Sequence, residues 1–118
     1  METKKIGEHG EDIACIYLKE KGHVILSRNY TCKIGEIDII SRNNDTVYVS
    51  EVKTRTSSRY GHPYESVDHI KKNKIFRIYK NYCLERNIET YKMMFSIISI
   101  IIDENSEIDI ECYEDIWG

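Results

Sequence analysis

Two carboxylates and a lysine lie close together near the middle of the sequence, in a stretch with the pattern of a β-hairpin. Asp38 falls in the strand-like segment 35–40, and Glu51 and Lys53 fall in a second such segment, 47–53. Carboxylate oxygens are ligands that Mg²⁺ prefers, together with waters and substrate phosphates. A lysine beside them can orient an attacking water or stabilise charge that develops on a phosphate. We interpret the trio as a candidate site for metal-dependent hydrolysis of phosphodiester bonds.

The register of the hairpin decides whether the two carboxylates meet. Asn and Asp favour tight turns, so we expect the chain to reverse at Asn44–Asp45. That turn would place Asp38 opposite Glu51 and Glu36 opposite Lys53. Directly opposed residues have Cβ atoms about 4.5–5.5 Å apart, and like charges placed that way destabilise a sheet. The opposed carboxylates therefore predict a divalent cation between them.

Side chains of a strand alternate between its two faces. We therefore expect one face of the hairpin to carry Glu36, Asp38, Ile40, Val49, Glu51 and Lys53. The other face would carry Ile37, Ile39, Tyr48, Ser50 and Val52. The alternative is a structural ion pair between Glu36 and Lys53 with Asp38 solvated, but such surface pairs contribute only about 0–1 kcal/mol.

A helix is expected over residues 6–21, and it adds a third carboxylate. Its apolar positions follow helical spacing and comprise Ile13, Ala14, Tyr17 and Leu18. Glu11 lies along the edge of that stripe, so it could reach over the sheet as a further metal ligand. A glutamate that faces solvent at the start of a helix is the alternative.

The remaining elements complete a single domain over residues 1–118. A second helix is expected over 64–85, and strands over 24–29, 35–40, 47–53, 92–103 and 108–113. The isoleucine-rich fourth strand has the composition of a strand covered on both faces. The order α-β-β-β-α-β-β predicts an α/β fold, with a mixed sheet flanked by helices.

Charge is unevenly distributed along the chain, although the net charge is only −3. Seven acidic residues and no Lys or Arg lie in an acidic C-terminal tail, 103–118. Residues 53–80 carry eight Lys or Arg against two acids. From this basic stretch we expect nucleic-acid contacts by Arg55, Arg59, Lys71, Lys72 and Lys74. A solvated helix face is the alternative, whereas for Arg28 and Lys33 we favour flexible surface charge.

The second helix should pack through Val67, Ile70, Ile75, Ile78, Tyr79 and Tyr82, which follow helical spacing. The four cysteines are scattered without a C-x-x-C pair, which favours free thiols in a reducing cytoplasm. No signal peptide is visible, and the most apolar run, 97–102, is too short to cross a bilayer as a helix. We therefore expect a cytoplasmic protein with no membrane association.

Residues of the candidate site, with several others, resemble the bacterial YraN/UPF0102 family. The matching motifs are Gly10-Glu11, Ala14, Tyr17-Leu18, Arg28-Asn29, Gly35-Glu36-Ile37-Asp38, Glu51-Val52-Lys53-Thr54-Arg55, Tyr60-Gly61-His62-Pro63, Glu65, Val67 and Lys71. They cover nearly the whole chain in the right order. The resemblance implies a PD-(D/E)XK restriction-endonuclease-like fold, similar to that of archaeal Holliday-junction resolvases.

Carried over by residue, the resemblance implies a site made of Glu11, Asp38, Glu51 and Lys53, with Lys71 facing the path of the phosphate. The sequence departs from the family pattern at Ser50, where an apolar residue is usual. It also departs at Met94-Phe95-Ser96, where relatives often carry Arg-Phe-Asp.

The leading hypothesis from the sequence is an endonuclease or nucleic-acid-processing protein that depends on Mg²⁺ or Mn²⁺ and hydrolyses phosphodiester bonds, with branched DNA as one candidate substrate. Asp38 and Glu51 would bind the metal with help from Glu11, and Lys53 would activate water. Cutting a symmetric junction would favour a homodimer. The alternatives are a nucleic-acid-binding module of the same fold without turnover, and a protein-interaction scaffold.

Overall fold

The computed structural model describes residues 3–56, 69–89 and 93–117. Its elements are, in chain order, α1 (Thr3–Glu20), β1 (Val24–Cys32), β2 (Gly35–Asn43), β3 (Thr46–Arg55), α2 (His69–Arg86), β4 (Met93–Ile102) and β5 (Ile108–Trp117). The predicted α/β class and the order α-β-β-β-α-β-β are confirmed. β1, β2, β3 and β5 are longer than predicted, whereas β4 ends one residue before its predicted end. The part of the predicted second helix before His69 lies outside the described residues.

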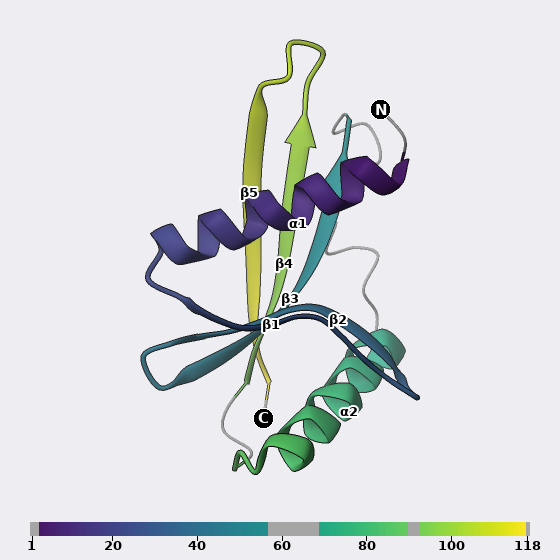
Figure 1. Ribbon diagram of the computed structural model, residues 1–118, viewed down its shortest axis with the longest axis vertical. Helices are drawn as coiled ribbons and strands as arrows, with labels where there is room; N and C mark the ends of the chain where they lie inside the picture. The colour runs from purple at the N-terminus through teal and green to yellow at the C-terminus, as the bar shows by residue number, and fades with distance from the viewer. Residues whose placement is uncertain (1–2, 57–68, 90–92, 118) are drawn as a thin grey trace.

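The five strands form one mixed sheet in the order β1-β2-β3-β4-β5. Neighbouring strands are antiparallel except β3 and β4, which run parallel. A parallel pair needs a crossover connection, and the segment that contains α2 supplies it. The two helices cover opposite faces of the sheet, and β3 runs on beside β4 while the β1–β2 hairpin bends away toward α2 (Figure 1).

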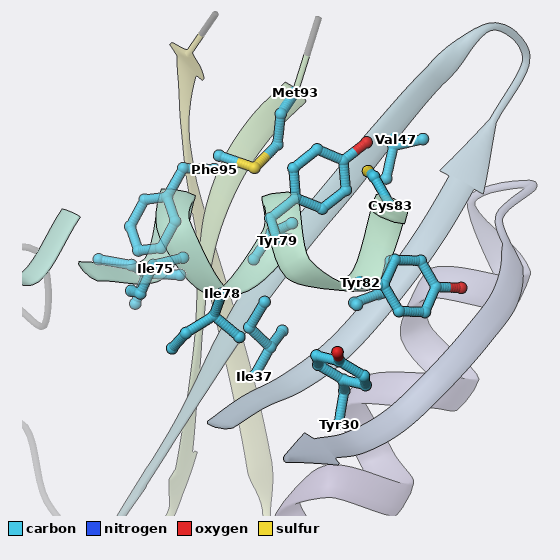
Figure 2. Close-up of a cluster of buried hydrophobic side chains, with 13 residues drawn as sticks. Tyr30, Ile37, Val47, Ile75, Ile78, Tyr79, Tyr82, Cys83, Met93 and Phe95 are labelled. Carbon is cyan, nitrogen blue, oxygen red and sulfur yellow. The ribbon is translucent and has the colours of Figure 1, made fainter. Parts of the chain in front are cut away.

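Two apolar clusters hold the helices against the sheet. The cluster under α2 joins helix residues such as Ile75 and Ile78 to Ile37 and Phe95 of the strands (Figure 2). The cluster under α1 includes Ile98, which is fully buried. Because β4 contributes to both clusters, the prediction that this strand is covered on both faces is confirmed.

The apolar face of α2 differs from the prediction at one position. Ile75, Ile78, Tyr79 and Tyr82 are buried as expected, whereas Ile70 is 80% exposed. Ile70 precedes Tyr79 by nine residues, which at about 100° per residue places it on the opposite side of the helix. The predicted packing of Ile70 is therefore wrong, and Val67 lies outside the described residues.

The β1–β2 hairpin twists sharply at one point, so the predicted alternation of β2 fails there. Ile37 belongs to the cluster under α2, but Ile39, two residues later, belongs to the cluster under α1. Asn29, which the register places opposite Asp38, has a left-handed backbone conformation (φ 53°). Asparagine tolerates this conformation better than most residues. The expectation that Ile37 and Ile39 share a face is therefore wrong.

The acidic C-terminal segment is mostly a strand and not a free tail. β5 pairs along its whole length with β4, and it has no neighbour on its other side, so it forms one edge of the described sheet. The predicted strand 108–113 thus extends to Trp117. Exposed acids such as Asp109 and Glu114 project from it.

Candidate functional site

The ladder between β2 and β3 has the predicted register, but it ends just before the candidate site. The pairs run from Asn43↔Thr46 to Ile39↔Ser50. Asp38 and Glu51 are not a ladder pair, so the prediction of directly opposed carboxylates is wrong. Asp38 instead accepts a hydrogen bond at Oδ2 from the backbone N–H of Val52, at 2.8 Å. The twist at Asp38 turns its side chain toward β3.

Beyond the last ladder pair, the two strands and α2 enclose a cavity of about 310 Å³. Asp38 and Glu51 both line it, so their side chains belong to one site although they are not paired. The other lining residues are Gly35, Glu36, Ile37, Val49, Ser50, Lys71, Lys74, Ile75, Ile78 and Phe95. The cavity therefore combines apolar side chains with three carboxylates, those of Glu36, Asp38 and Glu51, and with two lysines from α2.

Asp38 is held in a setting that disfavours its charge. Burial raises the pKa of its carboxyl to about 6, against an ordinary value of 3.8. The hydrogen bond from Val52 opposes the shift, while the negative charges of Glu11, Glu51 and Glu36 add to it. A cation beside Asp38 would relieve both the charge repulsion and the cost of burial.

The two carboxylate oxygens of Glu51 differ in the partners that they contact. Its Oε1 lies 3.1 Å from the Lys53 ammonium and 2.8 Å from the Lys71 ammonium. Its Oε2 is buried and has no hydrogen-bond partner among the described residues. Burial lowers the pKa of Lys71, but the hydrogen bond and charge of Glu51 outweigh it, so the pKa is raised overall. Lys71 therefore carries its full positive charge.

These two carboxylates fit a hard divalent ion of the Mg²⁺ type. A buried carboxylate oxygen without a partner and an aspartate whose charge is uncompensated are the groups that such an ion would satisfy. Among the described residues no set of three or more His, Cys, Asp or Glu side chains is grouped closely enough to hold a metal ion. The fit is therefore to a two-carboxylate site, in which waters and substrate phosphate complete the coordination.

Glu11 approaches the site from the other face of the sheet. Its helix lies close to β3 because Gly10 has no side chain, and a Cβ there would collide with the Thr54 hydroxyl. Arg28 holds the same helix turn, with its guanidinium 2.8 Å from Asp12 and 3.8 Å from Glu11. Arg28 is thus an ion-paired residue and not the flexible surface charge that we expected. Glu11 acts on Asp38 through its charge, and it does not line the cavity.

The predicted lysines and arginines divide into two groups. Lys71 and Lys74 line the cavity, whereas Lys53 contacts Glu51 without lining it. Arg55 and Lys72 are half-buried and lie outside the cavity lining, and Arg59 lies outside the described residues. The alternative ion pair between Glu36 and Lys53 is not among the ion pairs of the described residues.

The structure adds residues that the sequence reasoning did not assign to the site. Gly35 forms the cavity wall under α2, where a Cβ would lie 3.2 Å from side-chain carbons of Lys74 and Ile78. Ser50 lines the cavity although alternation predicts it on the other face, and its hydroxyl is buried without a partner among the described residues. The Gly35-Glu36-Ile37-Asp38 motif could have indicated that Gly35 belongs to the site. The alternation of side chains along β3 could not have indicated the same for Ser50.

Neither helix in the described part of the chain is long and apolar enough to span a membrane. A family model described as "Uncharacterised protein family UPF0102" matches residues 10–100. A UPF0102 protein of Clostridium acetobutylicum is 42% identical, over 95% of this chain and 93% of its own length. UPF0102 proteins of Persephonella marina and Caldanaerobacter subterraneus are 44% and 43% identical, over 80% and 85% of this chain and 82% of each relative. Every motif of the candidate site between Gly10 and Lys71 lies within the matched region, and the chain belongs to the UPF0102 family.

Proposed function

We propose that this protein is a nuclease that hydrolyses phosphodiester bonds in DNA with Mg²⁺ or Mn²⁺, on a PD-(D/E)XK-like fold. One observation carries the proposal: Asp38 and Glu51 line a single cavity with Lys71 and Lys74, and the Oε2 of Glu51 is buried there without a hydrogen-bond partner among the described residues. Two carboxylates with adjacent lysines are the donor set that metal-assisted phosphoryl chemistry uses.

Each residue of the site has a distinct role in this reaction. A divalent ion held by Asp38 and Glu51 would polarise the scissile phosphate and lower the pKa of an attacking water. Lys53, anchored 3.1 Å from Glu51, orients that water from the edge of the site. Lys74 and Lys71, on the cavity wall, bind phosphate oxygens and neutralise charge as the bond breaks.

Nucleic acid fits the site better than a small phosphate ester because cations continue along α2 beyond the cavity. Lys74 also lines a neighbouring open hollow, together with Lys33 and Arg77. Phosphates that follow the scissile one would meet these charges in turn, and such contacts make binding depend steeply on salt. Lys33 and Arg77 thus extend the predicted nucleic-acid surface.

Cleavage of labelled linear and branched DNA, with Mn²⁺ and with EDTA, tests the proposal. We expect metal-dependent cleavage by the wild type, none by Asp38→Asn or Lys53→Met, and wild-type rates for the matched controls Asp45→Asn and Lys19→Met. Binding of DNA without cleavage under any metal condition would favour the module without turnover. Failure to bind any nucleic acid at low salt would reject both readings and favour the scaffold.

A further inference from the structure

The Glu51 carboxylate has two cations at one oxygen and none at the other. Lys53 and Lys71 both approach Oε1, at 3.1 and 2.8 Å, although like charges repel. Oε2 is buried and lacks a partner among the described residues. An ion pair with a purely structural role would not be expected to place two cations at one carboxylate oxygen and leave the other carboxylate oxygen buried without a partner among the described residues. The observed arrangement is consistent with a carboxylate whose partners change during function.

The two lysines differ in what else they can reach. Lys53 lies two residues from Glu51 on the same strand, and it is not part of the cavity wall. Lys71 comes from α2, its side chain is 36% exposed, and it lines the cavity in which a phosphate would lie. Of the two, only Lys71 can exchange a carboxylate oxygen for a phosphate oxygen within the same cavity.

We propose that Lys71 is the resident counter-ion of Glu51, and that it exchanges Glu51 for the substrate phosphate when a divalent ion binds the two carboxylates. The proposal rests on the proposed function for the identity of the phosphate. Lys71 and the divalent ion then compete for Glu51, whereas the ion and nucleic acid assist one another because the released lysine gains a phosphate partner. By thermodynamic linkage this assistance must be equal in both directions.

Titration calorimetry with Mn²⁺ tests the competition directly. Lys71→Met keeps the length of the side chain and removes its charge, so Mn²⁺ should bind about tenfold more tightly than to the wild type, within the usual range of such couplings. Lys71→Arg keeps the charge and should restore wild-type affinity. Lys74→Met is the matched control, because Lys74 lines the same cavity and has no ion pair with Glu51 among those of the described residues. It should change Mn²⁺ affinity less than twofold.

Anisotropy of a labelled duplex, in EDTA and in Ca²⁺, tests the assistance. Wild-type affinity for DNA should rise when Ca²⁺ is added, and Lys71→Met should lose that rise. Unchanged or weaker Mn²⁺ binding by Lys71→Met would overturn the inference, even if the wild type cleaves DNA. Tighter Mn²⁺ binding by Lys71→Met, with no cleavage of DNA by the wild type, would uphold the competition and reject the nuclease function. Absence of Mn²⁺ binding by every variant would overturn both.

Discussion

Replacing Asp38 with asparagine should make the protein more stable at neutral pH and at the same time abolish divalent-ion binding. Asparagine has the shape of aspartate, and its side-chain oxygen can still accept the N–H of Val52, which Asp38 binds at 2.8 Å. The substitution therefore removes little besides the charge. Removing a charged group seldom stabilises a folded protein. A gain in stability is expected, however, where the charge serves function at the expense of folding.

The pKa of Asp38 sets the size of the gain. Folding raises it from 3.8 to about 6, chiefly through burial. Since each pKa unit corresponds to about 1.36 kcal/mol, the charged carboxylate costs the folded state at most about 3 kcal/mol. Asp38 is partly exposed, and solvent screening reduces that cost. We expect Asp38→Asn to be more stable than the wild type by about 2 kcal/mol at about pH 7.5.

The pH dependence has a definite sign. The folded state binds the Asp38 proton more tightly than the unfolded state, so this contribution to stability is present below pH 3.8 and is lost as the pH rises to about 6. Asp38→Asn does not titrate at this position. The two proteins should therefore be nearly equal in stability at about pH 4 and should diverge as the pH rises, with a constant difference above about pH 7.

Urea denaturation followed by circular dichroism, in EDTA across this pH range, measures the difference. Asp45→Asn is the matched control, because Asp45 is exposed in the β2–β3 turn and the same substitution there should give no pH-dependent gain. A wild type more stable than Asp38→Asn at neutral pH would refute the reasoning. So would a difference that does not change with pH.

A divalent ion should reverse the order of stability. A ligand that binds only the folded state at 100 times its dissociation constant adds about 2.7 kcal/mol. Mn²⁺ at such a concentration should therefore raise the wild type above Asp38→Asn, whose own stability should stay unchanged. An equal effect of Mn²⁺ on both proteins would mean that the ion binds elsewhere.

Three further predictions concern separate features. Gly10→Ala should lower the free energy of unfolding by about 1–3 kcal/mol because the added methyl collides with the Thr54 hydroxyl. In thermal denaturation, adding Thr54→Ala should restore this stability, whereas adding Thr54→Ser, which keeps the hydroxyl, should not. Ile70→Lys should change the free energy of unfolding by less than about 0.5 kcal/mol because the Ile70 side chain is 80% exposed. Ile78→Ala, at a buried position, should lower it by about 2–5 kcal/mol. Equal losses of stability in urea denaturation would contradict the assigned buried face of α2. Mn²⁺ affinity should fall about tenfold between about pH 7 and pH 5 as Asp38 is protonated, and calorimetry that finds no change would remove Asp38 from the site.

Local patterns predicted the elements and most of the register. The turn at Asn44–Asp45 fixed the pairing of β2 with β3 because few residues other than Asn, Asp and Gly fit such a turn. The segment that forms β4 is apolar at nearly every position, and this was enough to predict that the strand lies inside the sheet and is covered on both faces. These features depend on short stretches of sequence, and their signals are strong.

The direction of the Asp38 side chain could not be predicted in the same way. It depends on a sharp twist at Asn29, a residue on the neighbouring strand whose left-handed conformation has no signal in the alternation of β2. The pairing of Lys71 with Glu51 likewise depends on how α2 is set against the sheet. The exposure of Ile70, in contrast, could have been found by counting residues around the helix.

The acidic edge of the sheet restricts how this molecule can meet its partners. A second copy that extended the sheet through β5 would bring the carboxylates of Asp109, Glu111 and Glu114 against their own equivalents, and such contacts are unfavourable. Under the proposed function, the same negative potential would disfavour the approach of DNA along this edge. β5 therefore disfavours edge-to-edge pairing of two copies on this side of the sheet, and under the proposed function DNA would approach the cavity face that carries Lys71 and Lys74.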